Sequence, residues 1–266
     1  MKKTTILDLA RKKASGEKIT MLTAYDHPMA AIIDSAGIDA ILVGDSVGMV
    51  VLGYDSTVSV TMREMIHHTK AVTKGAKRAF IIADMPFMSY QASDESAIRN
   101  AGRLIKETGC DAVKIELGGE MVSRAKAIVD AGIPVMGHIG LTPQSTSKIG
   151  GYRVQGRESQ KAEEIIQSAS RLEKAGCFAV ILECVPIELA RKITAISGIP
   201  TIGIGAGPYC DGQILVTHDV IGYFDKFLPK FAKQYAKVGD VIRGAVSSFK
   251  KETENGIFPD QDHSFS

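Results

Sequence analysis

The chain has 266 residues, of which 45% are hydrophobic and 23% are charged, and its formal net charge is +2. This balance provides no bulk electrostatic attraction for nucleic acids or anionic membranes. Tryptophan is absent and only 6% of the residues are aromatic, so base-stacking platforms are not expected either. No apolar run reaches the roughly 18 residues that span a bilayer, and the length suits one large domain or two small ones.

The N-terminal segment, MKKTTILDLARKKASGEK, is basic but lacks the long apolar core of a secretory signal. None of the four cysteines belongs to a C-x-x-C pair. Cys110 and Cys177 stand just before apolar runs, where a free thiol behaves as a small hydrophobe. We therefore expect reduced cysteines and a cytoplasmic location rather than disulfides or a zinc site.

A recurring pattern organises the chain, in which a helical stretch ends in a small residue and a glycine and a short β-branched run follows. These glycines stand where a helix C-cap needs a left-handed residue, at Gly37, Gly109, Gly132, Gly176 and Gly198. The following runs are continuously apolar, which is typical of a parallel sheet covered by helices on both faces. The predicted strands are 19–23, 39–44, 79–84, 112–117, 133–138, 178–183, 199–204 and 213–217.

Helical patterns separate these strands. Thr61 is a candidate N-cap of one helix, and Ser93 or Asp94 of the next. The predicted helices cover residues 27–36, 61–75, 93–109, 119–131, 160–175, 186–197 and 227–251.

Eight alternating β/α units in one chain of this length predict an α/β fold, a single-domain (β/α)8 TIM barrel over residues 1–266 with a C-terminal helical extension and tail. A doubly wound parallel sheet is the competing arrangement. Residues 141–160 are polar and glycine-rich, and we expect this long connection to be a mobile lid or an interface arm. The GIGAG run at 203–207 favours tight turning or close backbone approach over a phosphate site.

In such a barrel the chemistry lies at the carboxyl ends of the strands. The ionisable and polar residues at these ends are Asp45 and Ser46 after the second strand, Asp84 in the third, Lys114 and Glu116 in the fourth, His138 in the fifth and Glu183 in the sixth. Lys114 and Glu116 are two positions apart, so they share one face of their strand, which we expect to be the face toward the barrel axis.

Each of these residues also has a purely structural interpretation. The alternatives are N-caps at Asp45 and Glu183, a turn at Asp84, a plain ion pair between Glu116 and Lys114, and a hydrogen-bonded structural role for His138. The joint pattern on successive strands favours a functional site.

Three carboxylates in one mouth repel one another, and Lys114 supplies only one positive charge. A divalent cation is the natural counterpart of Asp45, Asp84 and Glu116, and ligands that are all oxygen favour Mg²⁺, with Mn²⁺ as a near substitute. Such a cation can chelate a 2-oxo acid through its keto and carboxylate oxygens and acidify the neighbouring carbon. Glu183, on another strand, is then free to be the base.

Longer motifs point to a family. The chain carries ILVGDSVGMVVLGYDSTVSVTMREMIHHTKAV, ADMPFMSY, AVKIELGG, VMGHIGLTPQS, GGYRVQGR and GIGAGPYCDGQILV. From about residue 3 to the closing FPDQDHSF, it resembles the ketopantoate hydroxymethyltransferase family. The resemblance implies a barrel of the phosphoenolpyruvate mutase/isocitrate lyase type. It also implies transfer of a one-carbon unit from 5,10-methylenetetrahydrofolate to 3-methyl-2-oxobutanoate, which gives 2-dehydropantoate in pantothenate synthesis.

The resemblance implies roles for individual residues as well. It assigns the metal to Asp45, Asp84 and Glu116, the substrate to Asp45, Ser46, Asp84 and Lys114, and the role of proton acceptor to Glu183. It further implies a large homo-oligomer, often a decamer. We expect His138 to support the mouth and the 141–160 loop to close over the folate.

Two alternatives stay open. A carbon–carbon lyase or phosphonate enzyme on the same barrel would share the carboxylates, but typically carries a catalytic cysteine in a KKCGH-like loop. Here the loop after the fourth strand reads LGGEMVSR, and neither it nor 141–160 contains a cysteine. The other alternative is a non-catalytic barrel that binds a metal or metabolite, which would tolerate loss of the base, whereas Glu183 is present.

Overall fold

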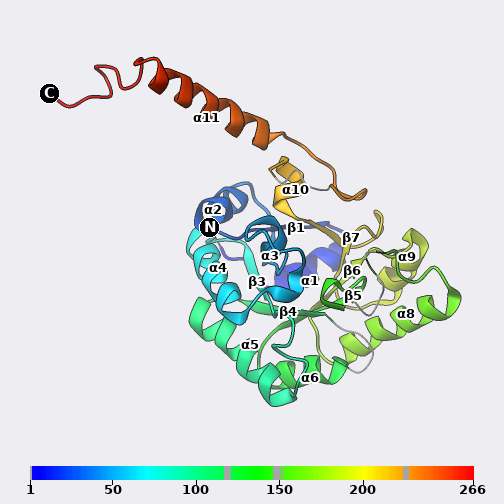
Figure 1. The fold of residues 1–266 in the computed structure, drawn as a ribbon. Helices are drawn as coiled ribbons and strands as arrows, with labels where there is room; N and C mark the ends of the chain where they lie inside the picture. The colour runs from blue at the N-terminus through cyan, green and yellow to red at the C-terminus, as the bar shows by residue number, and fades with distance from the viewer. Residues whose placement is uncertain (1, 117–120, 146–150, 152, 224–227) are drawn as a thin grey trace. The chain divides into compact units, whose positions relative to one another are not determined.

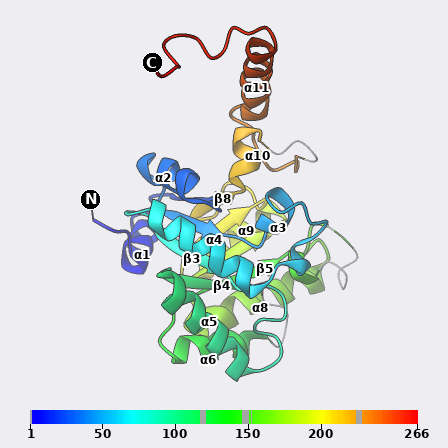
Figure 2. The same ribbon diagram turned by 60° about the vertical axis from the view of Figure 1, so that its left-hand side comes forward.

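The computed structural model describes residues 2–116, 121–145, 151, 153–223 and 228–266. The chain divides into two compact units, Met1–Val216 and Thr217–Ser266. In the first unit, helices surround a central ring of strands, as two views of the ribbon show (Figures 1 and 2). The expected single domain over 1–266 stays a prediction.

Eight parallel strands close into a barrel in the order β1 to β8. Their bounds are β1 Ile19–Thr23, β2 Ala40–Val43, β3 Phe80–Asp84, β4 Ala112–Glu116, β5 Val135–Gly140, β6 Ala179–Glu183, β7 Thr201–Ile204 and β8 Gly212–Leu215. The ring is completed by β1 and β8, where Met21 lies beside Ile214. Closure rules out the doubly wound sheet and confirms the predicted (β/α)8 TIM barrel.

Helix α1 Ile6–Ser15 precedes β1, and the other helices connect the strands around the outside of the ring (Figure 1). They are α2 His27–Ser35, α3 Val47–Val50, α4 Met62–Gly75, α5 Asp94–Thr108, α6 Val122–Asp130, α8 Ser159–Lys174 and α9 Ile187–Ile196, with short 3-10 turns at Thr57–Ser59 and Pro143–Ser145. Thr61 and Ser93 are N-caps as predicted, since each side chain accepts a backbone N–H one turn into its helix. Helix α1 was not predicted.

Four of the five predicted left-handed glycines are confirmed, and their φ angles lie between 74° and 89°. Gly198 is the exception, because it does not adopt a positive φ and α9 ends instead at the extended Ser197. Its backbone N–H donates to Glu173 Oε1 at 3.1 Å, and a Cβ at this position would stand 2.5 Å from the same oxygen. Gly198 therefore lies close to the end of the flexible Glu173 side chain and does not form a left-handed turn.

The predicted extension helix begins later than expected. Helix α10 spans Thr217–Ile221 and α11 spans Val238–Glu254, whereas the prediction covered 227–251. Residues 228–237 are not helical, and Pro229 disfavours helical backbone at the residue before it. Helix α11 has no buried residue, and it exposes Val241, Ile242, Val246 and Phe249.

Two apolar layers hold the barrel together. One fills the barrel interior with Leu42, Ile82, Met136 and other strand residues, and α1 contributes Leu9 to it. The other lies between the strands and the surrounding helices. Strand β4 contributes Ala112 to the interior, and Val113 and Ile115 to the helix side. Lys114 and Glu116 therefore share the interior face with Ala112, as the two-residue period predicts.

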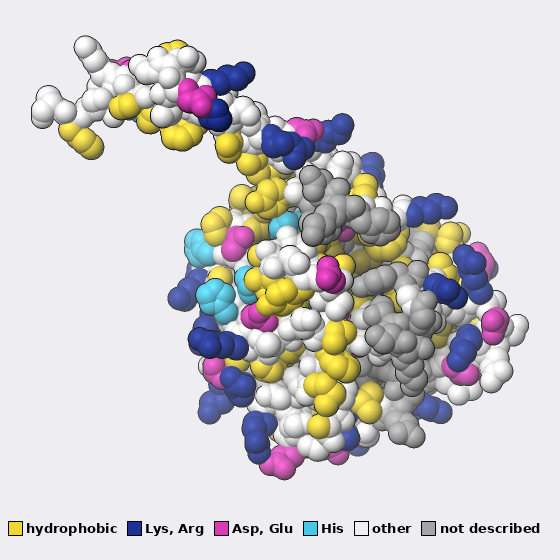
Figure 3. All heavy atoms as spheres, viewed as in Figure 1, with side chains coloured by type: hydrophobic (Ala, Val, Ile, Leu, Met, Phe, Trp, Pro, Cys, Tyr) yellow, Lys and Arg dark blue, Asp and Glu magenta, His cyan; other side chains and the backbone are white. Residues whose placement is uncertain are grey.

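The surface is electrostatically mixed. Lys and Arg side chains are interspersed with Asp and Glu over the viewed face (Figure 3). Among the described helices, none combines the length and hydropathy needed to cross a membrane. Of the predicted lid or arm, residues 146–150 and 152 lie outside the described chain, and residues 153–158 run as irregular backbone up to α8.

Candidate active site

The predicted ionisable residues meet at one end of the barrel. Asp84, Glu116 and Glu183 are the last residues of β3, β4 and β6, and Asp45 follows β2 after Gly44. The ladders place Asp84 beside Lys114 and Glu116 beside His138. Asp45, Asp84, Lys114, Glu116 and His138 are each at most 5% exposed. A buried cluster of charges is costly unless its members are paired, so its contacts indicate what it is built to do.

Asp84 forms a buried ion pair with Lys114. The other carboxylate oxygen of Asp84 accepts the backbone N–H of Asp45 at 3.1 Å. Burial raises the pKa of Asp84, although the neighbouring Lys114 acts in the opposite direction. Burial alone would lower the pKa of Lys114, but the charges of Asp84, Glu116 and Asp45 raise it above its ordinary value. Lys114 therefore carries the positive charge of the cluster.

The negative charge of Asp45 is poorly compensated by its protein surroundings. Burial, together with the negative charges of Asp84 and Glu116, raises the pKa of Asp45 to about 8. Its Oδ2 accepts a hydrogen bond from Gln144 Nε2 at 2.9 Å. Asp45 does not cap a helix, because the N-cap of α3 is Ser46 and makes no capping side-chain bond. The structural alternative for Asp45 was therefore wrong.

Ser46 lies beside Asp45 at the same mouth. Its hydroxyl is 2.8 Å from the Tyr25 hydroxyl. The preceding Gly44 packs close to this region, since a Cβ there would lie 2.7 Å from Ser46 Oγ and 3.5 Å from Asp84 Oδ2. A glycine at this position leaves room for these two polar side chains.

His138 stands between two carboxylates. Its Nδ1 lies 3.6 Å from Glu116 Oε1, and its Nε2 lies 3.1 Å from Glu183 Oε2. Burial alone would lower the pKa of His138, but the adjoining Glu116 and Glu183 carboxylates raise it to about 9. Helix α9 has Pro186 at its N-cap position with no capping side-chain bond, so Glu183 does not cap it. His138 thus lies between Glu116 and Glu183 at the mouth, and its supporting role stays a prediction.

Two residues that the sequence analysis missed complete the cluster. Gln144 sits in the short turn after β5, and its backbone N–H donates to Glu116 Oε2 at 2.9 Å. Tyr90 is buried, and its hydroxyl lies 2.9 Å from Gln144 Oε1. Gln144 falls within the GLTPQS segment just after a strand end, which was the only sequence signal available for it.

The donor chemistry fits a hard divalent cation. Oε1 of Glu116 is buried and has no hydrogen-bond donor among the described residues. In that same part of the chain, no three His, Cys, Asp or Glu side chains are already grouped to hold a metal ion. The ion pair with Lys114 engages Asp84. Asp45 and Glu116 each accept one hydrogen bond from Gln144, which leaves one oxygen of each without a hydrogen bond from the described chain. The carboxylates of Asp45, Asp84, Glu116 and Glu183 still outnumber the two cationic groups among them, Lys114 and His138.

The glycine-rich turn after β7 closes tightly. Gly205 and Gly207 have φ angles of 62° and 81°, and Gln213 Nε2 donates to the Gly207 carbonyl at 2.9 Å. Both glycines occupy the left-handed region, so the expectation of tight turning is confirmed.

Solved structures of other proteins have a similar fold. A phosphonopyruvate hydrolase structure aligns with a TM-score of 0.65 at 12% identity, covering 100% of this chain and 92% of that one. A 2,3-dimethylmalate lyase, described as a phosphoenolpyruvate mutase/isocitrate lyase superfamily member, aligns with a TM-score of 0.61 at 17% identity, covering 98% and 92%. These similarities establish the type of barrel.

Sequence relatives are much closer. The 3-methyl-2-oxobutanoate hydroxymethyltransferase of Moorella thermoacetica is 58% identical, over 98% of this chain and 97% of its own length. The protein of the same name from Thermoanaerobacter pseudethanolicus is also 58% identical, over 99% of this chain and 96% of its own length. The family model for ketopantoate hydroxymethyltransferase matches residues 3–261. The chain therefore belongs to the ketopantoate hydroxymethyltransferase family.

Proposed function

We propose that the chain transfers a one-carbon unit from 5,10-methylenetetrahydrofolate to 3-methyl-2-oxobutanoate and forms 2-dehydropantoate, as a hydroxymethyltransferase of pantothenate biosynthesis. The observation that carries the proposal is the buried cluster at the barrel mouth, in which a carboxylate–lysine group adjoins the Glu183–His138 pair. One part suits a chelating 2-oxo acid, and the other suits proton removal. The family name of the relatives supports the same reaction.

Asp45, Asp84 and Glu116 are the residues that would hold a divalent cation, Mg²⁺ or Mn²⁺. When bound, such a cation supplies Lewis acidity that favours an enolate of the 2-oxo acid. Support comes from the unpartnered buried oxygen of Glu116 and from the excess of carboxylates over cations. One of the solved relatives of the same fold is a phosphonopyruvate hydrolase in complex with oxalate and Mg²⁺, which aligns at 13% identity with a TM-score of 0.61.

The protein's own side chains carry the proton and orient the substrate. The Glu183 carboxylate takes the proton from C3 of the keto acid, and the electron pair delocalises onto the keto oxygen. Lys114 places its positive charge beside the developing negative charge, and Ser46 and Asp45 contact the substrate. C3 then bonds to the folate methylene carbon as the first of that carbon's two carbon–nitrogen bonds breaks. Water supplies the new hydroxyl group as the second carbon–nitrogen bond breaks, and the two freed nitrogens take up the protons lost from C3 and from water, which releases tetrahydrofolate.

His138 positions the base. Its ring lies between Glu116 and Glu183, and its pKa of about 9 leaves the ring protonated near neutral pH. The ring lies 3.1 Å from Glu183 Oε2, so it can hold that carboxylate in place for proton removal.

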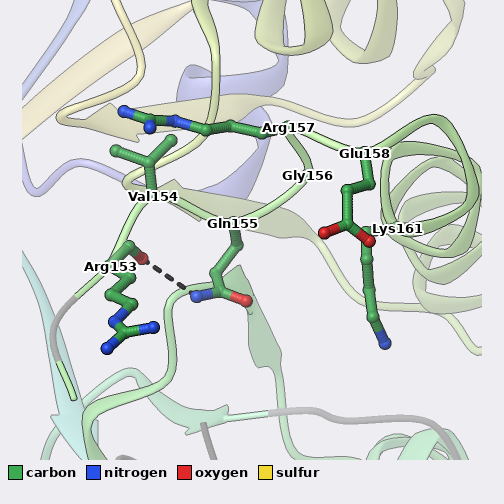
Figure 4. Close-up of a pocket in the computed structure, with 7 residues that line it drawn as sticks. All are labelled: Arg153, Val154, Gln155, Gly156, Arg157, Glu158 and Lys161. Carbon is green, nitrogen blue, oxygen red and sulfur yellow. Dashed lines mark hydrogen bonds between the residues drawn. The ribbon is translucent and has the colours of Figure 1, made fainter. Parts of the chain in front are cut away.

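A basic cavity beside the base suits the folate. It has a volume of about 540 Å³ and is lined by Arg153, Val154, Gln155, Gly156, Arg157, Glu158 and Lys161 (Figure 4). The Gln155 backbone N–H donates to the Cys184 carbonyl at 2.8 Å, so the cavity adjoins the end of β6. The glutamate part of a folate carries carboxylates, and Arg153 and Arg157 form no ion pair within the described residues. We assign the anionic end of the folate to this cavity.

The proposal is tested by direct assay. Purified protein with Mg²⁺, 3-methyl-2-oxobutanoate and 5,10-methylenetetrahydrofolate is expected to form 2-dehydropantoate, detected by mass spectrometry. Arg157→Gln is expected to raise the KM for the folate about 10- to 150-fold while leaving the KM for the keto acid unchanged, since one charged hydrogen bond is worth about 1.5–3 kcal/mol. Arg103→Gln, an exposed change on α5, is the matched control. Cleavage of the keto acid instead would favour the lyase alternative, and absence of any turnover would favour the non-catalytic barrel.

A homo-oligomer, with a decamer as the specific expectation, completes the proposal. The apolar side chains exposed along α11 support a surface covered by another copy of the chain. Light scattering behind size exclusion measures the assembly directly, and a monomer at micromolar concentration would contradict this part.

A further inference from the structure

The side chain of Gln144 contacts Asp45, which is 99 positions away in the sequence and belongs to the buried cluster. It is 5% exposed, and its Nε2 donates to Asp45 Oδ2 at 2.9 Å and to the Met85 carbonyl at 3.0 Å. Its Oε1 faces the Tyr90 hydroxyl at 2.9 Å and Gln91 Nε2 at 3.3 Å. Every polar atom of the amide therefore has a partner.

These partners fix which way the amide points. The Met85 carbonyl can only accept a hydrogen bond, so the amide NH₂ must face it and, with it, Asp45. The amide oxygen faces two groups that carry hydrogens, Tyr90 and Gln91. Gln144 therefore acts as a donor toward the carboxylates, and its oxygen is not available as a metal ligand.

Gln144 also contacts the second carboxylate through its backbone. Its N–H donates to Glu116 Oε2 at 2.9 Å. One residue thus occupies one oxygen of Asp45, which follows β2, and one oxygen of Glu116, which ends β4. Within the described residues no hydrogen bond reaches the remaining oxygens, Asp45 Oδ1 and Glu116 Oε1. The arrangement fixes the orientation of two carboxylates and leaves one oxygen of each without a hydrogen bond from the described residues, with His138 Nδ1 3.6 Å from that of Glu116.

We infer that Gln144 is a positioning residue for the cation, whose side-chain amide orients Asp45 so that its free oxygen is presented together with that of Glu116. This inference rests on the proposed function, because it assumes that a divalent cation binds this cluster. An outer hydrogen-bond partner of this kind typically changes metal affinity by about 10–100-fold when it is removed. A purely structural amide would instead affect only folding stability.

The test measures Mn²⁺ binding to the enzyme without substrate, by the electron paramagnetic resonance signal of free Mn²⁺. Gln144→Met keeps the length of the side chain and the backbone N–H to Glu116, but removes the donor to Asp45. We expect its Mn²⁺ dissociation constant to rise about tenfold or more, with the native circular dichroism spectrum retained. Gln91→Met, which removes only a donor to the Gln144 oxygen, and the exposed Gln167→Met should stay within about twofold of the parent.

The outcomes distinguish failure of the inferred Gln144 role from failure of the proposed function. If the parent binds no Mn²⁺, the metal part of the proposed function fails. If the parent binds Mn²⁺ and folded Gln144→Met binds it equally well, or if Gln91→Met weakens binding to the same extent, the inference is overturned and the function stands. If Gln144→Met does not fold, Gln144→Asn is measured in its place. Its amide is one methylene shorter, and the same rise of about tenfold or more in the Mn²⁺ dissociation constant is expected.

Discussion

Nε2 of His138 lies 3.1 Å from Oε2 of Glu183, the carboxylate proposed as the base. The same ring lies 3.6 Å from Glu116 on its other side, so one histidine links the proposed cation-binding residues to the proposed base. His138→Gln is expected to lower kcat about 10–100-fold, with a smaller change in the KM for the keto acid, because Glu183 loses its orienting partner. Steady-state kinetics checks this. His67→Gln, exposed on α4, is the control and should match the parent.

Lys114 compensates a buried carboxylate, and its removal should be costly. In Lys114→Met, Asp84 stays buried beside two other carboxylates without its ion pair. We expect the free energy of unfolding in metal-free buffer to fall by about 3–5 kcal/mol. Saturating Mg²⁺ should restore part of it, since ligands that bind the folded state stabilise it. Denaturant unfolding with and without Mg²⁺ measures both effects.

The control for Lys114 is a surface ion pair. Lys126→Met removes the exposed contact with Asp130 on α6 and should cost less than about 1 kcal/mol. An equal decrease in the free energy of unfolding in Lys114→Met and Lys126→Met would contradict the assignment of Lys114 as the principal counter-charge of the cluster.

Gly140 permits the close approach of β5 to the end of β6. Its φ is 95°, and a Cβ would lie 2.2 Å from the Glu183 carbonyl oxygen. Gly140→Ala is therefore expected to destabilise the fold by at least about 2 kcal/mol and to displace the base, with loss of activity. Gly102→Ala, in α5 with no atom within 4 Å of the new methyl, should instead stabilise the fold by about 1 kcal/mol. Thermal melts of the pair provide the comparison.

Cys177 makes the fold sensitive to alkaline pH. Burial raises the pKa of its thiol from 9.0 to about 12. The unfolded chain releases this proton first, so the stabilisation is complete below pH 9 and is lost as the pH rises from 9 toward 12. This thiol should lower the free energy of unfolding by up to about 1.4 kcal/mol per pH unit in that range. Denaturant unfolding at pH values between 8 and 10.5 measures the free energy of unfolding. This free energy should fall less steeply with pH in Cys177→Ala than in the parent, and equal slopes in the two proteins would contradict the account.

The barrel could be predicted from the sequence because each β/α unit carries its own local signals. Continuous apolar runs mark strands buried on both faces, and glycines after helices mark left-handed turns, as at Gly109 and Gly176. Asp84, Glu116 and Glu183 could be placed at one mouth because parallel strands point in one direction. The end of each strand then specifies a position in space as well as in the chain.

The contacts that tune the site could not be predicted in this way. Gln144 and Asp45 are 99 positions apart, and Tyr90 meets Glu116 across 26 positions, with no periodic pattern to announce either contact. The sequence suggested a cation as the counterpart of Asp45, whereas the contact present in the structure is an amide donor. Such contacts depend on how loops pack, which local propensities do not encode.

The central claim is that Glu183 removes the C3 proton of a keto acid held at this mouth. Nuclear magnetic resonance of 3-methyl-2-oxobutanoate in D₂O with Mg²⁺ and enzyme measures that step alone, without the folate. The account predicts exchange of the C3 proton by the parent and a loss of about 10³-fold in Glu183→Gln, with exchange unchanged in Glu188→Gln, an exposed residue on α9. Absence of exchange in the parent with or without folate, or full exchange in Glu183→Gln, would contradict it.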